Sequence, residues 1–389
     1  MKSFFILLAG CACLILGGCI TEYEAKGLNE VENILVVEGI ITGGESIITL
    51  SRSVNLTNDS PTPYVYVNDA IVSVECDDGT LIQAIDLYYR PDGRYVIPMG
   101  DLNFDRQYRL KIEVYEADNS ANNGLYAPYS SRMFEYCSDY THPIRTPEID
   151  SVFWSKRDLG QPVNIHVATH STTGDVMFYR WSYREDWEIV SDRRSFGEYM
   201  YPYYCWNGDN SRGLLVGSAE KTVFGQLTNI ILEISPFDRK IEVLYRIKVK
   251  QNAISKQAYD YYANIKKNTR QTANIFSPVQ SELKGNITCV TDPDRPVIGY
   301  VDFSTTTQSQ LYIPYDDLAY EFAGRDWNCT DISQDSLMAK FMYIPETYVP
   351  YYWINEMGGR TLYYVYNRCI DCTFFGTTIK PDDWPNDHQ

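Results

Sequence analysis

Near the C-terminal end of the sequence, Cys369 and Cys372 have the spacing of two chemical motifs. A zinc site would need two more ligands, usually a second pair, and none follows. A thioredoxin-like redox site would place the pair at the start of a helix in a βαβ unit, whereas this pair lies in a tail without helical periodicity. We interpret both cysteines as halves of structural disulfides, and we expect them to reach back to Cys205 and Cys329.

Two other groups of residues could do chemistry. His166 and His170 have the spacing of zinc ligands on a helix, but the local pattern is that of a strand, and no HExxH glutamate accompanies them. Glu185, Asp186 and Glu188 flank a tryptophan, an arrangement that could suit glycoside hydrolysis. Acidic residues are also common at strand ends. Because no GxSxG elbow, P-loop or GxGxxG motif is present, we expect no catalytic residues, no metal site and no cofactor.

Two aromatic segments, residues 199–206 and 341–353, are the strongest candidates for binding. Prolines interrupt the second one, and proline-broken aromatic loops make poor core material. Such segments either pack locally on the second domain or form a contact surface for a partner or ligand. The candidate contact residues are Tyr201, Tyr203, Tyr204, Trp206, Tyr348, Tyr351, Tyr352 and Trp353.

The N-terminus has the pattern of a secretory signal peptide, residues 1–18. Its apolar run is shorter than the about 20 residues that cross a bilayer. Leu16-Gly17-Gly18-Cys19 resembles a bacterial lipobox, so we expect Cys19 to be acylated, for example with palmitate, and to anchor the chain. Glutamates at positions 22 and 24 resemble the surface-export signal of Bacteroidetes lipoproteins, which favours the cell surface over the periplasmic face.

Composition excludes some classes of function. The formal charge of −17 argues against binding of nucleic acid and against electrostatic attachment to anionic lipid. Four histidines give general-base chemistry few candidates, whereas 33 tyrosines suit half-buried strands and contact surfaces. An exported chain meets an oxidising compartment, which permits disulfides. An odd number of cysteines follows Cys19, so at least one of them stays unpaired.

The chain is mainly β in pattern and long enough for two domains. After a tether at 19–33, short strands with turn signals predict a first β-sandwich at 34–137, which resembles transthyretin-like or carboxypeptidase-regulatory-like domains. Two prolines without periodicity indicate a linker at 138–148. Residues 149–389 predict an immunoglobulin-like second β domain with an aromatic insertion, one helix at 255–270 and a cysteine-containing tail.

Several segments occur in an order that resembles a known family. They are 34–42, 178–181, 205–206, 251–261, 283–287 and 299–301, followed by the Cys369–Cys372 pair and Lys380-Pro381. The whole looks like a Bacteroidetes outer-membrane lipoprotein family that is known only as a domain of unknown function. Members are encoded beside TonB-dependent receptors, and the family supplies no catalytic residues.

This resemblance implies a non-enzymatic surface lipoprotein, an accessory or ligand-binding subunit of a TonB-dependent nutrient-uptake system. Its expected partners are the outer membrane, through the lipid anchor, and a TonB-dependent receptor. Two alternatives stay open. One is an adhesin or structural surface module, and the other is a surface hydrolase that uses carboxylates such as Glu185 and Asp186.

Overall fold

The computed structural model describes residues 33–53, 65–85, 91–117, 131–195, 198–222, 225–236, 238–271, 284–318, 329–356 and 359–385. The predicted signal peptide, Cys19 and the tether as far as residue 32 lie outside these residues. Within the described ranges the strands form five sheets, which confirms the prediction of a mainly β protein. The described helices include none that is long and apolar enough to cross a membrane.

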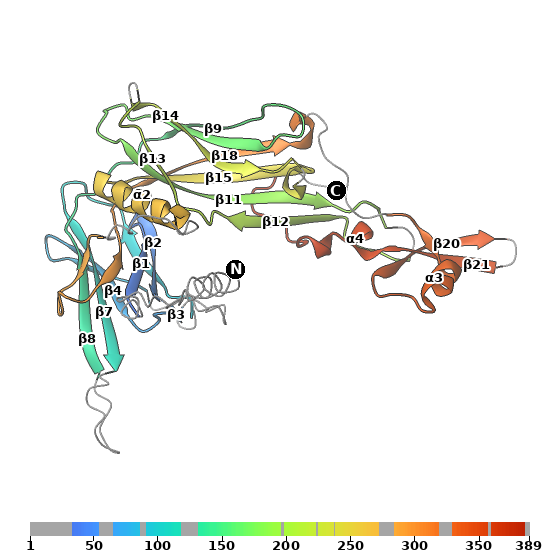
Figure 1. The fold of residues 1–389 in the computed structure, drawn as a ribbon, viewed down its shortest axis with the longest axis horizontal. Helices are drawn as coiled ribbons and strands as arrows, with labels where there is room; N and C mark the ends of the chain where they lie inside the picture. Colours follow the sequence, from blue (N-terminus) through green and yellow to red (C-terminus); the bar gives the residue numbers. More distant parts are fainter. Residues whose placement is uncertain are drawn as a thin grey trace, which may run out of the picture.

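Two sheets pack face to face at the N-terminal end of the molecule (Figure 1). In the order β17-β1-β2-β3, with β6 beside β2, the first comprises β1 (Leu35–Gly39), β2 (Gly44–Arg52), β3 (Val65–Tyr66), β6 (Arg94–Gly100) and β17 (Val297–Gly299). In the order β16-β8-β7-β4-β5, the second comprises β4 (Ile71–Cys76), β5 (Leu81–Gln83), β7 (Tyr108–Ala117), β8 (Ser131–Ser138) and β16 (Ile287–Cys289). We call these two sheets the N-terminal sandwich.

Strand β7 shows why these residues fold this way. Successive side chains of a strand point to opposite faces. Leu110 and Ile112 are fully buried in the shared core, whereas Arg109 and Lys111 point outward, where Arg109 pairs with Glu75 at 2.7 Å. The clean alternation of the sequence therefore decides which face of the sheet becomes core.

The N-terminal sandwich is completed by residues from much later in the chain. The sequence placed residues 287–299 in the second domain, but β17 pairs in parallel with β1, and β16 pairs with β8. Gly285 makes this return possible, because a Cβ there would lie 1.7 Å from the carbonyl oxygen of Gly299. The side chain of Asn286 then exchanges two hydrogen bonds with the backbone of Val301, at 2.8 and 2.9 Å.

Two further sheets form a central sandwich with its own core (Figure 1). In the order β14-β10-β9, one comprises β9 (Ile149–Ser155), β10 (Val163–Thr169) and β14 (Leu227–Ile234). In the order β12-β11-β15-β18, with β13 beside β11, the other comprises β11 (Phe178–Val190), β12 (Tyr204–Asn210), β13 (Leu215–Ser218), β15 (Leu244–Ala253) and β18 (Thr306–Pro314). We call this second sheet the central sheet. The finer resemblances to transthyretin-like and immunoglobulin-like domains stay predictions.

The segment predicted as a linker, 138–148, packs along both sandwiches. Thr141 forms a bridge with Tyr108, and Ile144 forms a parallel bridge with Ser304. Its backbone groups are thus paired, so it behaves as part of the framework. The prediction of an irregular insertion at 191–215 is wrong in part, since β12 lies within it and pairs with β11 over seven residues.

The predicted helix is confirmed as α2 (Lys256–Gln271), and Ser255 caps it by accepting a hydrogen bond from the amide of Ala258 at 3.1 Å. The buried face of α2 includes Ala258, Tyr261 and Tyr262, which pack in a cluster with Tyr300. The same cluster includes Ile40 of the N-terminal sandwich and Phe178 of the central sheet, so α2 joins the two sandwiches.

The chain was predicted to have one helix, but the C-terminal region adds α3 (Gln334–Phe341) and α4 (Asn367–Ile370). The fifth sheet of the described residues has three strands in the order β19-β21-β20: β19 (Ile332–Ser333), β20 (Tyr348–Glu356) and β21 (Gly359–Tyr366). The segment 341–353, interpreted as proline-broken loop, is loop at 342–347 but strand from Tyr348 onward. Pro350 is tolerated because β20 is an edge strand, and on its outer side no backbone amide has to donate a hydrogen bond to a neighbouring strand. Short 3₁₀ turns span Arg239–Ile241, Tyr315–Leu318 and Cys372–Phe374.

The joint between the sandwiches contains a buried carboxyl group. Asp302 is only 4 % exposed and accepts hydrogen bonds from the amide and hydroxyl of Ser255, at 2.9 and 3.1 Å. Burial raises the pKa of Asp302 to about 6. Because the folded pKa lies above the unfolded one, the native state binds the proton more tightly, and this contribution to stability is lost as pH rises through about 4 to 6.

We therefore expect Asp302→Asn to be less harmful near neutral pH than in acid. Relative to wild type, the free energy of unfolding of the variant should improve by about 2 kcal/mol between roughly pH 4.5 and roughly pH 7.5. Urea unfolding at both pH values measures this difference. An unchanged difference would mean that Asp302 titrates in the native state as it does in the unfolded chain.

Candidate binding surfaces

The structure brings the two aromatic segments together, although about 140 residues separate them in the chain. Residues 191–195 and 198–203 pack against the β19-β21-β20 sheet. With residues 329–356 and 359–371 they form what we call the distal module. Tyr199 lies in a cluster with Leu337 and Trp353, and Tyr201 lies in a second cluster with Val365. This module projects from the central sandwich at the end of the molecule opposite the N-terminal sandwich (Figure 1).

Most of the eight predicted contact residues serve packing. Trp206 and Tyr351 are buried, with exposed fractions of 8 % and 3 %, and the other six are half-buried. Their rings stack on other rings: Tyr352 lies 5.2 Å from Tyr363 in a stacked pair, and Tyr348 meets Tyr366 edge to face at 5.9 Å. The interpretation as local packing therefore describes these residues better than the interpretation as an open contact surface.

The most exposed apolar side chains of the distal module lie instead at the C-terminal end of α3 and directly after it. Met338, Met342 and Tyr343, which we call the methionine patch, are 43 %, 87 % and 62 % exposed. Met342 ends α3 in the left-handed conformation, with φ of 62°, a position where glycine is the usual residue. Neither methionine is among the predicted contact residues, because the sequence pattern predicts no helix here and the candidate residues are all aromatic.

Two disulfides hold the distal module. Cys329–Cys369 closes it internally, and Cys205–Cys372 ties its base to β12. These are the four cysteines that the sequence assigned to disulfides, with the C-terminal pair reaching back as expected. Asp192 lies beside Cys329 and Cys369 in a cluster that resembles a metal site, but disulfide sulfurs do not supply the thiolates that such a site needs.

The free cysteines among the described residues are Cys76, Cys137 and Cys289, and all three are buried. Burial raises the pKa of Cys137 to about 11. A thiol with so high a pKa stays protonated near neutral pH and is a poor nucleophile. The thiol of Cys137 is therefore not a reactive site.

Two of the candidate carboxylates, Glu185 and Asp186, face opposite sides of the central sheet. Glu185 points into the central sandwich, where it accepts hydrogen bonds from Lys240 at 2.6 Å and from Tyr245 at 2.8 Å. Asp186 points to the other face and binds Arg246 at 2.7 Å. Adjacent residues of a strand lie on opposite faces, so these two cannot act on one bond as a pair. Glu188 is also buried and accepts a hydrogen bond from Trp384 at 3.3 Å.

His166 lies in β10, and His170 follows the end of that strand directly. His166 contacts the hydroxyl of Ser155 at 2.7 Å and stacks on Phe153, and His170 pairs with Asp150 at 2.8 Å. Their side chains thus have separate protein partners, and they do not form a shared metal site.

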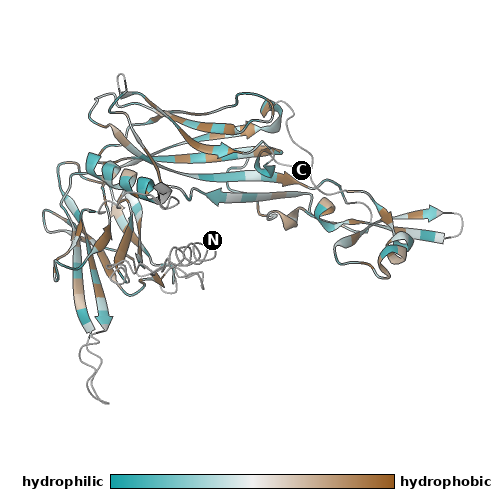
Figure 2. Ribbon diagram, viewed as in Figure 1, coloured by the Kyte–Doolittle hydropathy of each residue, from teal (hydrophilic) through white to brown (hydrophobic). Residues whose placement is uncertain are grey.

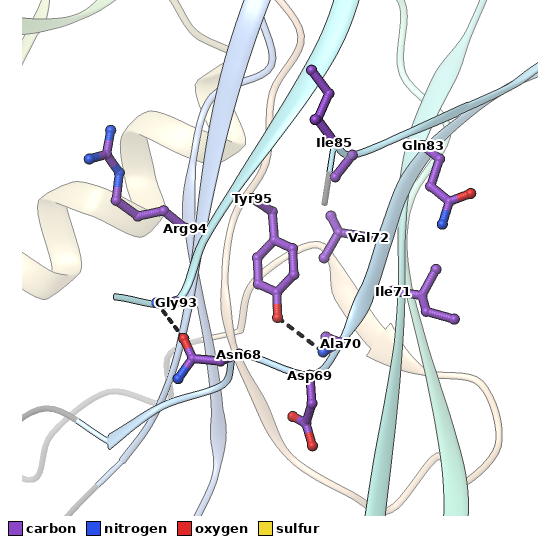
Figure 3. Close-up of a pocket in the computed structure, with 11 residues that line it drawn as sticks. Asn68, Asp69, Ala70, Ile71, Val72, Gln83, Ile85, Gly93, Arg94 and Tyr95 are labelled. Carbon is purple, nitrogen blue, oxygen red and sulfur yellow. Dashed lines mark hydrogen bonds between the residues drawn. The ribbon is translucent and has the colours of Figure 1, made fainter. Parts of the chain in front are cut away.

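A cavity of about 310 Å³ opens between the two sheets of the N-terminal sandwich (Figure 3). The hydroxyl of Tyr95 projects into it, accepts a hydrogen bond from the amide of Ala70 at 3.0 Å and donates to the carbonyl of Val67 at 2.9 Å. Asn68 accepts another from the amide of Gly93 at 2.8 Å. These polar groups shape the turn around them, so the cavity provides few free groups for a ligand.

Long stretches of β11 and β12 are hydrophilic (Figure 2). The strand register places Arg180, Ser182, Lys250 and Gln308 on the outward face of the central sheet. A second cavity, of about 600 Å³, lies where this face meets β2 of the N-terminal sandwich. Arg180 and Lys250 line it from the central sheet, and Thr42 and Ser46 line it from the N-terminal sandwich. No single sequence motif marks this cavity, because its residues come from four separate strands and their connections.

Several of the segments that carry the family resemblance stabilise the fold. Trp181 donates to the side chain of Gln251 at 2.8 Å, and Gln251 in turn donates to the carbonyl of Pro147 at 2.9 Å. Gly285 and Asn286 close the N-terminal sandwich, as described above.

Comparison with known proteins gives a family and no activity. No curated protein matches the chain. A family model described as a domain of unknown function, DUF4249, matches residues 20–122 and 130–310, which is most of the chain. On this match, the chain belongs to the DUF4249 family.

Proposed function

We propose that this chain is an accessory lipoprotein of a TonB-dependent nutrient-uptake system, anchored at the bacterial outer membrane through Cys19. In this proposal the distal module contacts the receptor, and the protein itself catalyses no reaction. The anchor fixes the N-terminal end at the membrane, and the far end of the elongated molecule is left to reach a partner.

The observation that supports this proposal most directly is the methionine patch. Met342 and Tyr343 expose large apolar side chains in a chain with a net charge of −17, and Met342 does so from a left-handed backbone position. Methionine is flexible and polarizable, and it is common on surfaces that adapt to a partner. Neighbouring exposed apolar residues, unlike singly scattered ones, are typical of interaction sites.

The N-terminal sequence supports the anchored location. Leu16-Gly17-Gly18-Cys19 has the order of a lipobox, and the family match begins at residue 20, directly after the cysteine. Stable anchoring needs two or more acyl chains, which a processed lipoprotein cysteine provides. The Bacteroidetes-type acidic residues after Cys19 favour the outer surface.

The experiment is co-purification of the full-length, lipidated protein from detergent-solubilised membranes of its own host. We expect a TonB-dependent receptor among the recovered proteins, identified by mass spectrometry. The variant Met338→Glu/Met342→Glu/Tyr343→Ser should reduce receptor recovery by at least about tenfold, because charged groups would be buried at the contact.

Leu159→Glu is the matched control, since Leu159 is 68 % exposed in the central sandwich, away from the distal module. It should leave receptor recovery unchanged. If wild-type protein is recovered without any receptor, the proposal fails and the adhesin or structural alternative gains support. Equal recovery with the patch variant would place the contact elsewhere.

A further inference from the structure

The outward face of the central sheet is a regular array of polar side chains. The strand register places residues of β11, β15 and β18 directly opposite one another, with Cβ atoms about 5 Å apart. Three adjacent rows cross the sheet in this way. They are Arg180–Asn252–Thr306, Ser182–Lys250–Gln308 and Arg184–Lys248–Gln310.

This array is positively charged, although the chain as a whole is strongly acidic. Lys250 is exposed, and among the described residues it has no ion-pair partner. Arg180 donates to the hydroxyl of Tyr262 at 3.1 Å, a contact that leaves its charge uncompensated. Arg184 and Lys248 are paired with carboxylates, so the free positive charge is concentrated at the Arg180–Lys250 end.

The free charges lie in a groove. The 600 Å³ cavity has Arg180, Lys250 and Gln308 on its central-sheet wall and a single acidic residue, Glu45, on the wall from the N-terminal sandwich. A further cavity of about 380 Å³ shares Gln308 and continues past Lys248. The two cavities together follow the rows of the array along the strands.

The chemistry of the walls limits the ligand. Cations attract carboxylates, and amide and hydroxyl side chains such as Asn252, Gln308 and Ser182 match the hydroxyl groups of sugars. β11 and β15, which carry Arg180 and Lys250, lie inside the sheet, so the backbone groups beside these cations are already paired. An extended peptide would find no main-chain partners there. A sugar chain that bears carboxylates has both the hydroxyl groups and the negative charge that match these walls.

We propose that this groove binds an acidic oligosaccharide, with Lys250 and Arg180 contacting sugar carboxylates and Gln308 contacting hydroxyls. The proposal names a ligand for the uptake role above and rests on that role only for its biological setting. Binding is tested on the protein alone, without a receptor, so failure here leaves the co-purification experiment to decide the proposed function independently.

The test is calorimetric titration of the full-length protein in detergent with a galacturonic acid tetrasaccharide. A neutral galactose tetrasaccharide is the control ligand, and a short polyglutamate peptide tests charge without sugar. We expect the acidic tetrasaccharide to bind at least about tenfold more tightly than either. Loss of one charge-assisted hydrogen bond is large enough for such a ratio.

Lys250→Glu should weaken binding of the acidic tetrasaccharide by at least about tenfold, and Gln308→Ala should weaken it by a few-fold. Lys267→Glu on α2 is the control, because Lys267 is exposed and does not line the groove. Equal binding of the neutral sugar, equal binding of polyglutamate, no effect of Lys250→Glu, or no binding of any probe at millimolar concentration would each overturn the proposal.

Discussion

Replacing Cys205 and Cys372 together by alanine is expected to lower the free energy of unfolding by about 5 kcal/mol. The disulfide joins residues 167 positions apart, so in the oxidised chain it restricts a very large loop of the unfolded state. Both cysteines are also buried in the core of the central sandwich, where alanine leaves unfilled volume. The double variant avoids a stray thiol that could pair with another cysteine.

Urea unfolding monitored by tryptophan fluorescence measures this loss. Cys329→Ala/Cys369→Ala is the comparison variant, since its disulfide closes a loop with a separation of 40 and should cost about 4 kcal/mol. We expect the second variant to loosen the distal module while the central sandwich keeps its amide protection. A smaller effect for Cys205 and Cys372 than for Cys329 and Cys369 would contradict the loop argument.

Local patterns in the sequence predict the elements of this fold well. The alternation in β7 predicts both the strand and its buried face, and Ser255 predicts the start of α2. The expectation of export predicts disulfides, and the odd number of cysteines predicts a free thiol; the described residues contain both. Each of these inferences depends on residues that are close together in the chain or on one property of the whole chain.

Long-range pairings are not visible in such patterns. Nothing in residues 284–301 indicates that they return to the N-terminal sandwich, because the contact of Gly285 with Gly299 exists only after the return. The same applies to Pro350, which argues against a strand until the strand is known to be an edge. Tertiary context overrides local preference at both places.

The candidate sites were hidden for a related reason. Aromatic content marks residues that pack as readily as residues that bind, and Tyr351 and Trp206 turned out to be buried. The groove depends on the register among three strands, so its cations Arg180 and Lys250, 70 positions apart in the sequence, carry no common signal. Only the fold places them in one cavity.

Arg246→Met is expected to lower the free energy of unfolding by about 3 kcal/mol or more. Arg246 is 2 % exposed and donates to Asp186, which is 1 % exposed, at 2.7 and 3.2 Å. Methionine fills much of the same volume but leaves the carboxylate inside the protein with only Arg184 as a partner. Arg246 also donates to the carbonyl of Asp382 at 3.0 Å, so the C-terminal segment should lose amide protection in the variant.

Arg212→Met is the matched control, because Arg212 forms an exposed ion pair with Asp209 on β12. This variant should lower the free energy of unfolding by less than about 0.5 kcal/mol. The decisive comparison is Asp186→Asn/Arg246→Met. If the carboxylate serves the fold, removing both charges should cost less than removing Arg246 alone, since no uncompensated charge remains inside. A double variant as unstable as the sum of its single variants would show that the two residues act independently, and the structural role assigned to Asp186 would then be wrong.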